Sequence, residues 1–114
     1  MQPIFHIVAV PEWQAACELG RYAPESLASE GFIHFSFEHQ VALVANRLYR
    51  GRANLIVVEI DPAALPEPIV LEDLYDADEE FPHVYGAIPT SAEIARHPLN
   101  TDSDGRFVFA ARSS

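Results

Sequence analysis

Apolar runs that contain few polar residues predict a series of strands along the chain. Residues 4–10 are apolar and rich in β-branched side chains, with one histidine between them, which is typical of an interior strand. Residues 55–60 form a continuous apolar run that predicts a central strand, closed by Asp61 and Pro62 as the cap of one helical turn. Further strands are predicted over residues 69–71, 81–88 and 106–110, the last after a tight turn at 102–105.

The strand predicted over residues 32–37 has two different faces. Side chains alternate along a strand, so Ile33, Phe35 and Phe37 share one face, which we assign to the core. Phe32, His34 and Ser36 share the other face. An imidazole and a hydroxyl therefore lie side by side on a surface that is only partly apolar.

Helices are predicted between these strands. Pro11 and Glu12 suit a helix N-terminus and Gly20 suits its end, which gives a helix over residues 12–19, and a short helical turn is expected at 25–30. A third helix over 38–50 has an apolar stripe with helical spacing and is closed by Gly51. Residues 91–95 fit either a helical turn or an edge strand. The order of elements predicts an α+β fold with small mixed or antiparallel sheets and two or three helices.

Length and charge restrict the possible functions. A chain of 114 residues is expected to form a single domain, residues 1–114. Its net charge of −10, with 17 acidic residues and no lysine among seven basic ones, disfavours non-specific binding of nucleic acid and favours a small-molecule partner. Cys17 is the only cysteine, which fits the reducing cytoplasm, and the sequence has no apolar run of the ~20 residues that cross a membrane.

Three histidines lie in the middle of predicted strands. His6, His34 and His83 each have large apolar neighbours, and Ser36 and Tyr85 lie two residues beyond the second and the third. A buried imidazole needs a hydrogen-bond partner, so three of them on different strands predict a shared polar pocket. The alternative is three unrelated core histidines. Their spacing does not match a preorganised zinc site, so no metal is expected.

The remaining candidate residues are charged or lie at element ends. Arg47, Arg50 and Arg52 form a basic patch, and a guanidinium matches phosphate well. Surface ion pairs are the alternative for Arg47 and Arg50 and the preferred interpretation for Arg52. The acidic stretch 72–80 is interpreted as a solvated loop, His39 and His97 as surface residues, and Cys17 as a packed side chain with no basic neighbour.

Five short motifs, in this order, resemble one bacterial family. The chain is identified as a member of the family called domain of unknown function nine-five-two. The motifs are Phe5-His6-Ile7, the segment 26–36 (SLASEGFIHFS), the segment 45–51 (ANRLYRG), the segment 81–86 (FPHVYG) and the segment 104–108 (DGRFV).

This family is similar to the ADP-ribosyltransferase superfamily, especially its RNA 2′-phosphotransferase branch. The similarity implies split small sheets that hold NAD in the cleft between them, with His6 near a ribose. It also implies a His-x-Ser strand (His34, Ser36) and a helix with basic residues (Arg47, Arg50). Where toxin-type transferases have a late carboxylate, this chain has His83 and Tyr85. The basic tail and arginine-rich surface of the RNA branch do not occur here, so a large RNA substrate is not expected.

The resulting hypothesis is an enzyme-like domain that binds NAD, ADP-ribose or another small phosphorylated ligand in a cleft lined by histidine, arginine and tyrosine. Its chemistry is expected to be of the ADP-ribosyl- or phosphotransferase type. The alternative is a non-catalytic binding or interaction module with a degenerate cleft. The catalytic residues are predicted to be His34 and His83. The ligand-binding residues are predicted to be His6, Ser36, Arg47, Arg50 and Tyr85.

Overall fold

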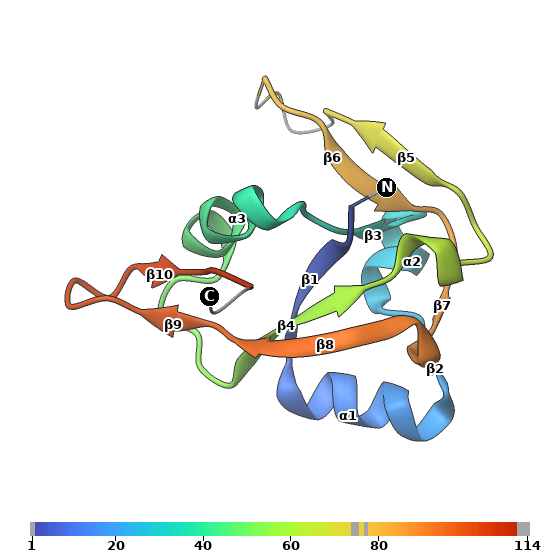
Figure 1. The fold of residues 1–114 in the computed structure, drawn as a ribbon, viewed down its shortest axis with the longest axis horizontal. Coiled ribbons are helices and arrows are strands. Elements are labelled where there is room, and N and C mark those ends of the chain that lie inside the picture. The colour runs from blue at the N-terminus through green and yellow to red at the C-terminus, as the bar shows by residue number, and fades with distance from the viewer. Residues whose placement is uncertain (1, 74–75, 77, 112–114) are drawn as a thin grey trace.

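One three-stranded antiparallel sheet forms the centre of the molecule (Figure 1). The computed structural model describes residues 2–73, 76 and 78–111. In the central sheet, β4 (Leu55–Ile60) lies between β1 (Ile4–Ala9) and β8 (Glu93–Pro98). The middle position of β4 confirms the central strand that its continuous apolar run predicts, because such a strand is covered on both faces.

A second antiparallel sheet carries the His34 strand. β6 (Phe81–Val84) lies between β3 (Ile33–His34) and β5 (Ile69–Glu72). The two sheets meet where Phe5 and Ser36 exchange both of their backbone hydrogen bonds at 2.8 Å. The segment just after β3 is therefore connected to β1, and residues from both sheets lie next to each other at this junction.

Three α-helices cover the sheets in the described part of the chain. α1 (Val10–Leu19) lies along one side of the central sheet, and α3 (Val41–Leu48) lies on the other side, near β3 (Figure 1). The C-terminal residue of α1 is followed by Gly20 at φ +77°, the left-handed conformation that glycine adopts without a steric penalty. α2 (Glu25–Glu30) leads directly into β3.

Short elements complete the fold. β2 (Arg21–Tyr22) pairs with β7 (Ile88–Pro89), and β9 (Asn100–Thr101) pairs with β10 (Phe107–Val108). The single turns of 3₁₀ helix are η1 (Glu38–Gln40), η2 (Pro62–Ala64) and η3 (Thr90–Ala92). In η2 the Asp61 carboxylate accepts a hydrogen bond from the Ala63 N–H at 3.0 Å, which confirms the predicted cap. These elements together confirm an α+β fold with several small antiparallel sheets.

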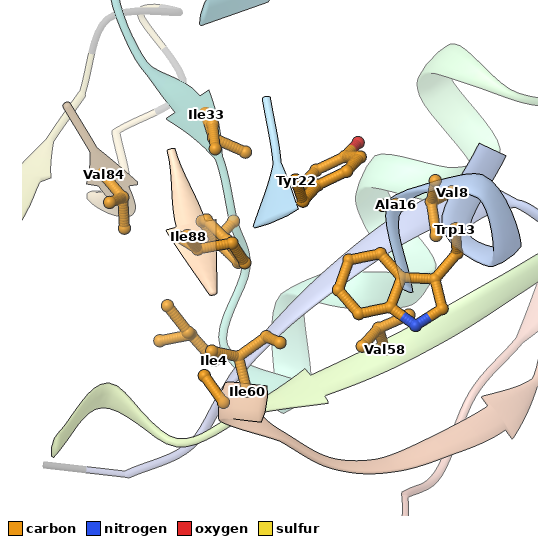
Figure 2. Close-up of a cluster of buried hydrophobic side chains, with 12 residues drawn as sticks. Ile4, Val8, Trp13, Ala16, Tyr22, Ile33, Val58, Ile60, Val84 and Ile88 are labelled. Carbon is orange, nitrogen blue, oxygen red and sulfur yellow. The ribbon is translucent and has the colours of Figure 1, made fainter. Parts of the chain in front are cut away.

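Buried side chains form two clusters, one on each face of the central sheet. Trp13 of α1 packs near Val8 and Val58 in the first cluster, which continues to Ile60 and to Ile88 of β7 (Figure 2). The second cluster joins the opposite face of β1 and β4 to α3 and β10. Its buried members are Phe5, Ile7, Val41, Val44, Ala45, Val57, Phe81 and Phe107. Because β1 contributes to both clusters, its apolar pattern is continuous rather than alternating.

Several predicted elements are shorter than their apolar patterns. The strand over 32–37 pairs with β6 only at Ile33–His34, because the chain then changes partner and Ser36 bonds to Phe5 of β1. The predicted alternation holds nevertheless, since Ile33 and Phe35 are buried in the first cluster. The strand over 81–88 is divided between β6 and β7, and that over 106–110 is reduced to β10. Residues 91–95 contain the end of η3 and the start of β8.

The helix predicted over residues 38–50 is wrong at both ends. It begins as the 3₁₀ turn η1, and α3 ends at Leu48 because Tyr49 has φ −125° and ψ 7°. Arg50 therefore lies in the turn before Gly51, where the Arg52 N–H donates to the Tyr49 carbonyl at 3.0 Å. Arg47 and Arg50 consequently do not share a helix face.

Two side chains, those of His97 and Cys17, have surroundings that differ from the predicted ones. His97 is not a surface residue: it lies on β8, is largely buried, and its Nε2 is 2.8 Å from the Glu59 carboxylate on β4. Cys17 does have a basic neighbour, because Arg96 Nη2 donates to its sulfur at 3.7 Å. Both partners come from β4 or β8, which are distant in the sequence, so local patterns could not reveal them. Of the described helices, none is long and apolar enough to cross a membrane.

Candidate functional site

His34 and His83 face each other across the β3–β6 ladder. They are directly paired in the strand register, which places both side chains on the same face of the sheet. His34 Nδ1 lies 3.3 Å from His83 Nε2, within hydrogen-bond distance. His83 is fully buried, with 0% exposure, and stacks on Phe32 with 4.3 Å between ring centroids. The strand register and the stacked ring thus fix the position of His83.

Glu72 extends this contact to the third strand of the sheet. Val70 of β5 is opposite His83, so Glu72, two residues further along β5, lies diagonally across from the same histidine. Its Oε1 accepts hydrogen bonds from His83 Nδ1 at 2.9 Å and from the Tyr85 hydroxyl at 2.6 Å. The bond from Tyr85, followed by that from His83, lowers the pKa of Glu72, which favours the carboxylate.

His6 is connected to the same segment from β1. Its Nδ1 lies 2.8 Å from the backbone carbonyl oxygen of His34, and its Nε2 lies 2.6 Å from the Tyr22 hydroxyl. A carbonyl oxygen can only accept, so Nδ1 carries the proton and Nε2 of the neutral ring accepts from Tyr22. Burial lowers the pKa of His6 to about 4, although the bond to His34 opposes this shift. His6 therefore joins β1 to β3 as a neutral ring.

His34 is also neutral at physiological pH. Burial is the main cause that lowers its pKa from an ordinary 6.5 to about 4, and the nearby rings of His83 and His6 lower it further. Its Nε2 atom is shielded from solvent. A neutral imidazole can accept a proton from a bound ligand, so its protonation state at neutral pH suits a general base.

Two adjoining cavities form a cleft between α3 and the strands β1, β3 and β6. One has a volume of about 360 Å³ and the other about 340 Å³. Both are lined by His34, Val44 and Leu48, so they meet along this shared wall. Arg47 and Phe81 complete the first cavity. The second is completed by Phe5, His6, Ile7, Ser26, Glu30, Ser36 and Tyr49.

The sequence-predicted site residues divide into two groups. Four of them line the cleft: His6, His34, Ser36 and Arg47. His83 lies beneath the wall of the cleft, because it contacts His34 but is itself fully buried.

The other two, Arg50 and Tyr85, do not belong to the described lining of either cavity. Arg50 lies beyond the end of α3, and the exposed Tyr85 is bound to Glu72. The three predicted imidazoles are thus linked in one series of contacts, but only two of them face the cavity.

Some residues of the site carry no recognisable motif. Ser26 and Glu30 of α2 line the second cavity, and their spacing of four residues, which places both on one helix face, is the signal that could have indicated them. Leu48 belongs to the predicted apolar stripe of α3, yet 66% of it is exposed because the stripe continues from the core into the cleft. The sequence places Glu72 in the acidic loop 72–80, parts of which lie outside the described residues, but in the structure Glu72 ends β5.

The histidines are arranged as hydrogen-bond partners. Within residues 2–73, 76 and 78–111, no three histidine, cysteine or acidic side chains are grouped as a metal site requires. The contacts that the structure shows between these side chains are hydrogen bonds from ring to carbonyl, hydroxyl, ring or carboxylate. This site therefore suits recognition of polar groups and transfer of a proton.

Comparison with known proteins identifies the family. Residues 7–95 match the family described as "Protein of unknown function (DUF952)", and the chain belongs to this family. The matched range includes the end of β1 from Ile7 onward, the His34 strand, α3 and the His83 strand. No curated protein matches the chain.

Solved structures of one bacterial protein share the fold. The chain is similar to the X-ray crystal structure of protein CC0527 from Caulobacter crescentus, with 30% identity over 94% of each chain and a TM-score of 0.82. A double mutant of CC0527 gives 29% identity over 94% of each chain and the same TM-score of 0.82. The solution NMR structure of CC0527 gives 29% identity, 92% of this chain, 90% of that chain and a TM-score of 0.72.

Proposed function

We propose that the cleft between α3 and β3 binds a small phosphorylated ligand, with NAD or ADP-ribose as the leading candidates, and that the protein catalyses an ADP-ribosyl- or phosphotransferase-type reaction. The observation that supports this most is that Arg47 and the neutral His34 both line one largely apolar cavity. Such a cavity with a few convergent polar groups is the usual form of a small-molecule site.

Arg47 supplies the phosphate-binding charge. Of the described residues that line the cleft, Arg47 alone carries a positive charge at neutral pH, since His6 and His34 are neutral. The whole chain has a net charge of −10, so an anionic ligand depends on this local guanidinium. A guanidinium can donate two parallel hydrogen bonds to one phosphate.

The rest of the lining suits a nucleoside. Phe5, Phe81 and Leu48 provide apolar surface for an aromatic base. Ser26, Ser36 and Glu30 carry hydroxyl or carboxylate groups that can bond to ribose hydroxyls. The apolar side chains therefore suit the base of an adenosine or nicotinamide nucleoside, and the polar side chains suit its ribose.

His34 provides the proton acceptor. NAD, when bound, would supply an ADP-ribosyl group activated at the carbon that carries nicotinamide. His34 would take the proton of the attacking nucleophile, and Arg47 would hold the phosphate so that the reacting carbon is oriented. The resemblance to the ADP-ribosyltransferase superfamily supports this choice of ligand.

A non-catalytic binding module is the second candidate. It is favoured by His6, whose two ring nitrogens are both engaged within the protein, so that this histidine supports the fold of the junction. In this case the same cleft would bind the ligand without turnover. Measuring nicotinamide release from NAD by chromatography separates the two candidates.

Isothermal titration of the protein with ADP-ribose and NAD tests the proposal. We expect binding by the wild-type protein and at least about tenfold weaker binding by Arg47→Gln, because a hydrogen bond to a charged group is lost. Arg50→Gln is the matched control: it removes the same charge three residues away, outside the described lining, and should bind like the wild type. No heat from folded wild-type protein at millimolar ligand would refute the proposal.

A further inference from the structure

Two opposite charges lie on the wall of the cleft, one in each cavity. Arg47 lines the first cavity and Glu30 lines the second. They come from different helices, α3 and α2, and the two cavities meet along a shared wall that includes Val44 and Leu48. A ligand that spans both cavities therefore meets a guanidinium at one end and a carboxylate at the other.

The other described side chains of the lining are uncharged at neutral pH. Burial lowers the pKa of His6 and of His34 to about 4, so both rings are neutral. Burial also raises the pKa of Tyr49, which stays a neutral phenol. The remaining lining residues are serines or apolar residues. Arg47 and Glu30 thus carry the charges of their two cavities.

The charges just behind the second cavity offset each other. The guanidinium of Arg52 lies over the Tyr49 ring, with 5.1 Å between its central carbon and the ring centroid. Arg52 lowers the pKa of Tyr49 and Glu12 raises it, so charges of both signs act on this phenol. Neither residue belongs to the described lining. Glu30 therefore determines the local charge of the second cavity.

The fold itself does not explain a carboxylate at position 30. Glu30 is the last residue of α2 and is followed by Gly31 at φ +89°. The C-terminal end of a helix carries partial negative charge, so an acidic side chain there is unfavourable for the helix. Glu30 is exposed and forms no ion pair within the part of the chain that the structure describes. A cationic group of a ligand would balance this charge.

We propose that the cleft selects a ligand with one anionic and one cationic end, and that the nicotinamide nucleoside of oxidised NAD occupies the second cavity with its positively charged ring beside Glu30. This inference rests on the proposed function and makes it more specific. Arg47 binds the pyrophosphate in the first cavity, at the other end of the cleft. The nicotinamide ring of NADH is nearly the same size but neutral, so Glu30 is the specificity-determining residue that distinguishes the two forms.

Isothermal titration with NAD and with NADH tests the inference. At about 10 mM salt we expect the wild-type protein to bind NAD about threefold more tightly than NADH, which is the effect of a solvent-exposed pair of charges. This preference should shrink at about 200 mM salt, because the two charges are then screened. Short titrations at low temperature, checked by chromatography for free nicotinamide, keep the NAD intact.

Three variants assign the preference to one side chain. Glu30→Gln should reduce the ratio of the two affinities to about one, because it removes the charge and keeps the size of the side chain. Glu25→Gln is the matched control: it removes the same charge from the same helix, outside the described lining, and should keep the wild-type ratio. Arg47→Gln should weaken both ligands equally, since both contain the same pyrophosphate.

Stability measurements show whether Glu30 has a structural role. By circular dichroism, Glu30→Gln should be at least as stable as the wild type, because α2 loses an unfavourable terminal charge. Equal affinity of the wild type for NAD and NADH, or a ratio that Glu30→Gln leaves unchanged, would overturn the inference.

The failure of this inference can be told apart from the failure of the proposed function. Equal binding of NAD and NADH removes the role of Glu30 and leaves the phosphate site at Arg47 intact. If the folded wild-type protein binds neither NAD, NADH nor ADP-ribose, the proposed function is refuted and the selection by charge with it.

Discussion

Individual polar residues in the described interior are held by partners that come from distant parts of the chain. His6 is bound to Tyr22 and to the His34 carbonyl, and His83 is bound to His34 and Glu72. The sequence identifies these histidines because each interrupts an apolar run. It does not identify Glu72, since one acidic residue at the start of an acidic stretch gives no signal of its strand partner.

At the residue scale we predict that the protein loses stability in mild acid. The pKa values of His6 and His34 are lowered to about 4 in the folded state, whereas both ionise near 6.5 in the unfolded chain. The unfolded state therefore binds more protons as the pH falls from 6.5 to 4. The free energy of unfolding should drop over this window by on the order of 2 kcal/mol for each group, and these two groups should contribute no slope above about pH 7.5.

Urea unfolding at a series of pH values measures this slope. His34→Gln should flatten it, because one of the two groups no longer titrates. Asn100→Ala on the exposed strand β9 is the control, since it removes no ionisable group and should leave the slope of the wild type. Stability that is constant between pH 6.5 and pH 4 would contradict the assignment of neutral, buried histidines.

At the scale of elements, the sequence predicts the presence of a helix or strand better than its length. β1, β4 and α2 follow their patterns closely. The strand over 32–37 and the helix over 38–50 are shorter than predicted, because the ends of these elements depend on tertiary partners: the Phe5–Ser36 bridge in one case and the non-helical Tyr49 in the other. Which cleft residues α2 and α3 contribute could not be predicted, since it depends on how the helices pack.

A clamp between α3 and β10 gives a prediction at this scale. The Asn46 side chain accepts from the Phe107 N–H at 2.8 Å and donates to the Phe107 carbonyl at 2.9 Å. Asn46→Ala should destabilise the protein by about 1–3 kcal/mol, because both Phe107 groups lose a partner, and should speed hydrogen exchange at the Phe107 amide. Asn100→Ala on the exposed strand β9 is the control. Unchanged exchange at Phe107 would contradict the clamp.

At the scale of the whole molecule, net charge opposes the compact state. Like charges in a chain of net charge −10 repel one another, and salt screens this repulsion. We expect the Tm, measured by circular dichroism, to rise when the salt concentration increases from about 10 mM to about 200 mM. A falling Tm would show instead that local ion pairs, such as that between Arg96 and Glu93, dominate the electrostatic contribution.

Because the chain as a whole is negative, the positive charge of Arg47 sets the cleft apart from the rest of the molecule. The family match covers β3, β6, α3 and the end of β1, so most of the architecture that builds this cleft is shared beyond this chain. The central claim is that Arg47 and His34 mark the place where a phosphorylated ligand binds to an otherwise acidic protein.

Mapping backbone amide shifts by NMR during titration with ADP-ribose tests this claim most directly. The account predicts that the largest changes fall on residues around the cleft, in α2, α3 and the segment after β3, and that Arg47→Gln reduces them. Changes confined to α1 and to the edge strand β8 of the central sheet would contradict it, as would a spectrum that does not change at millimolar ADP-ribose.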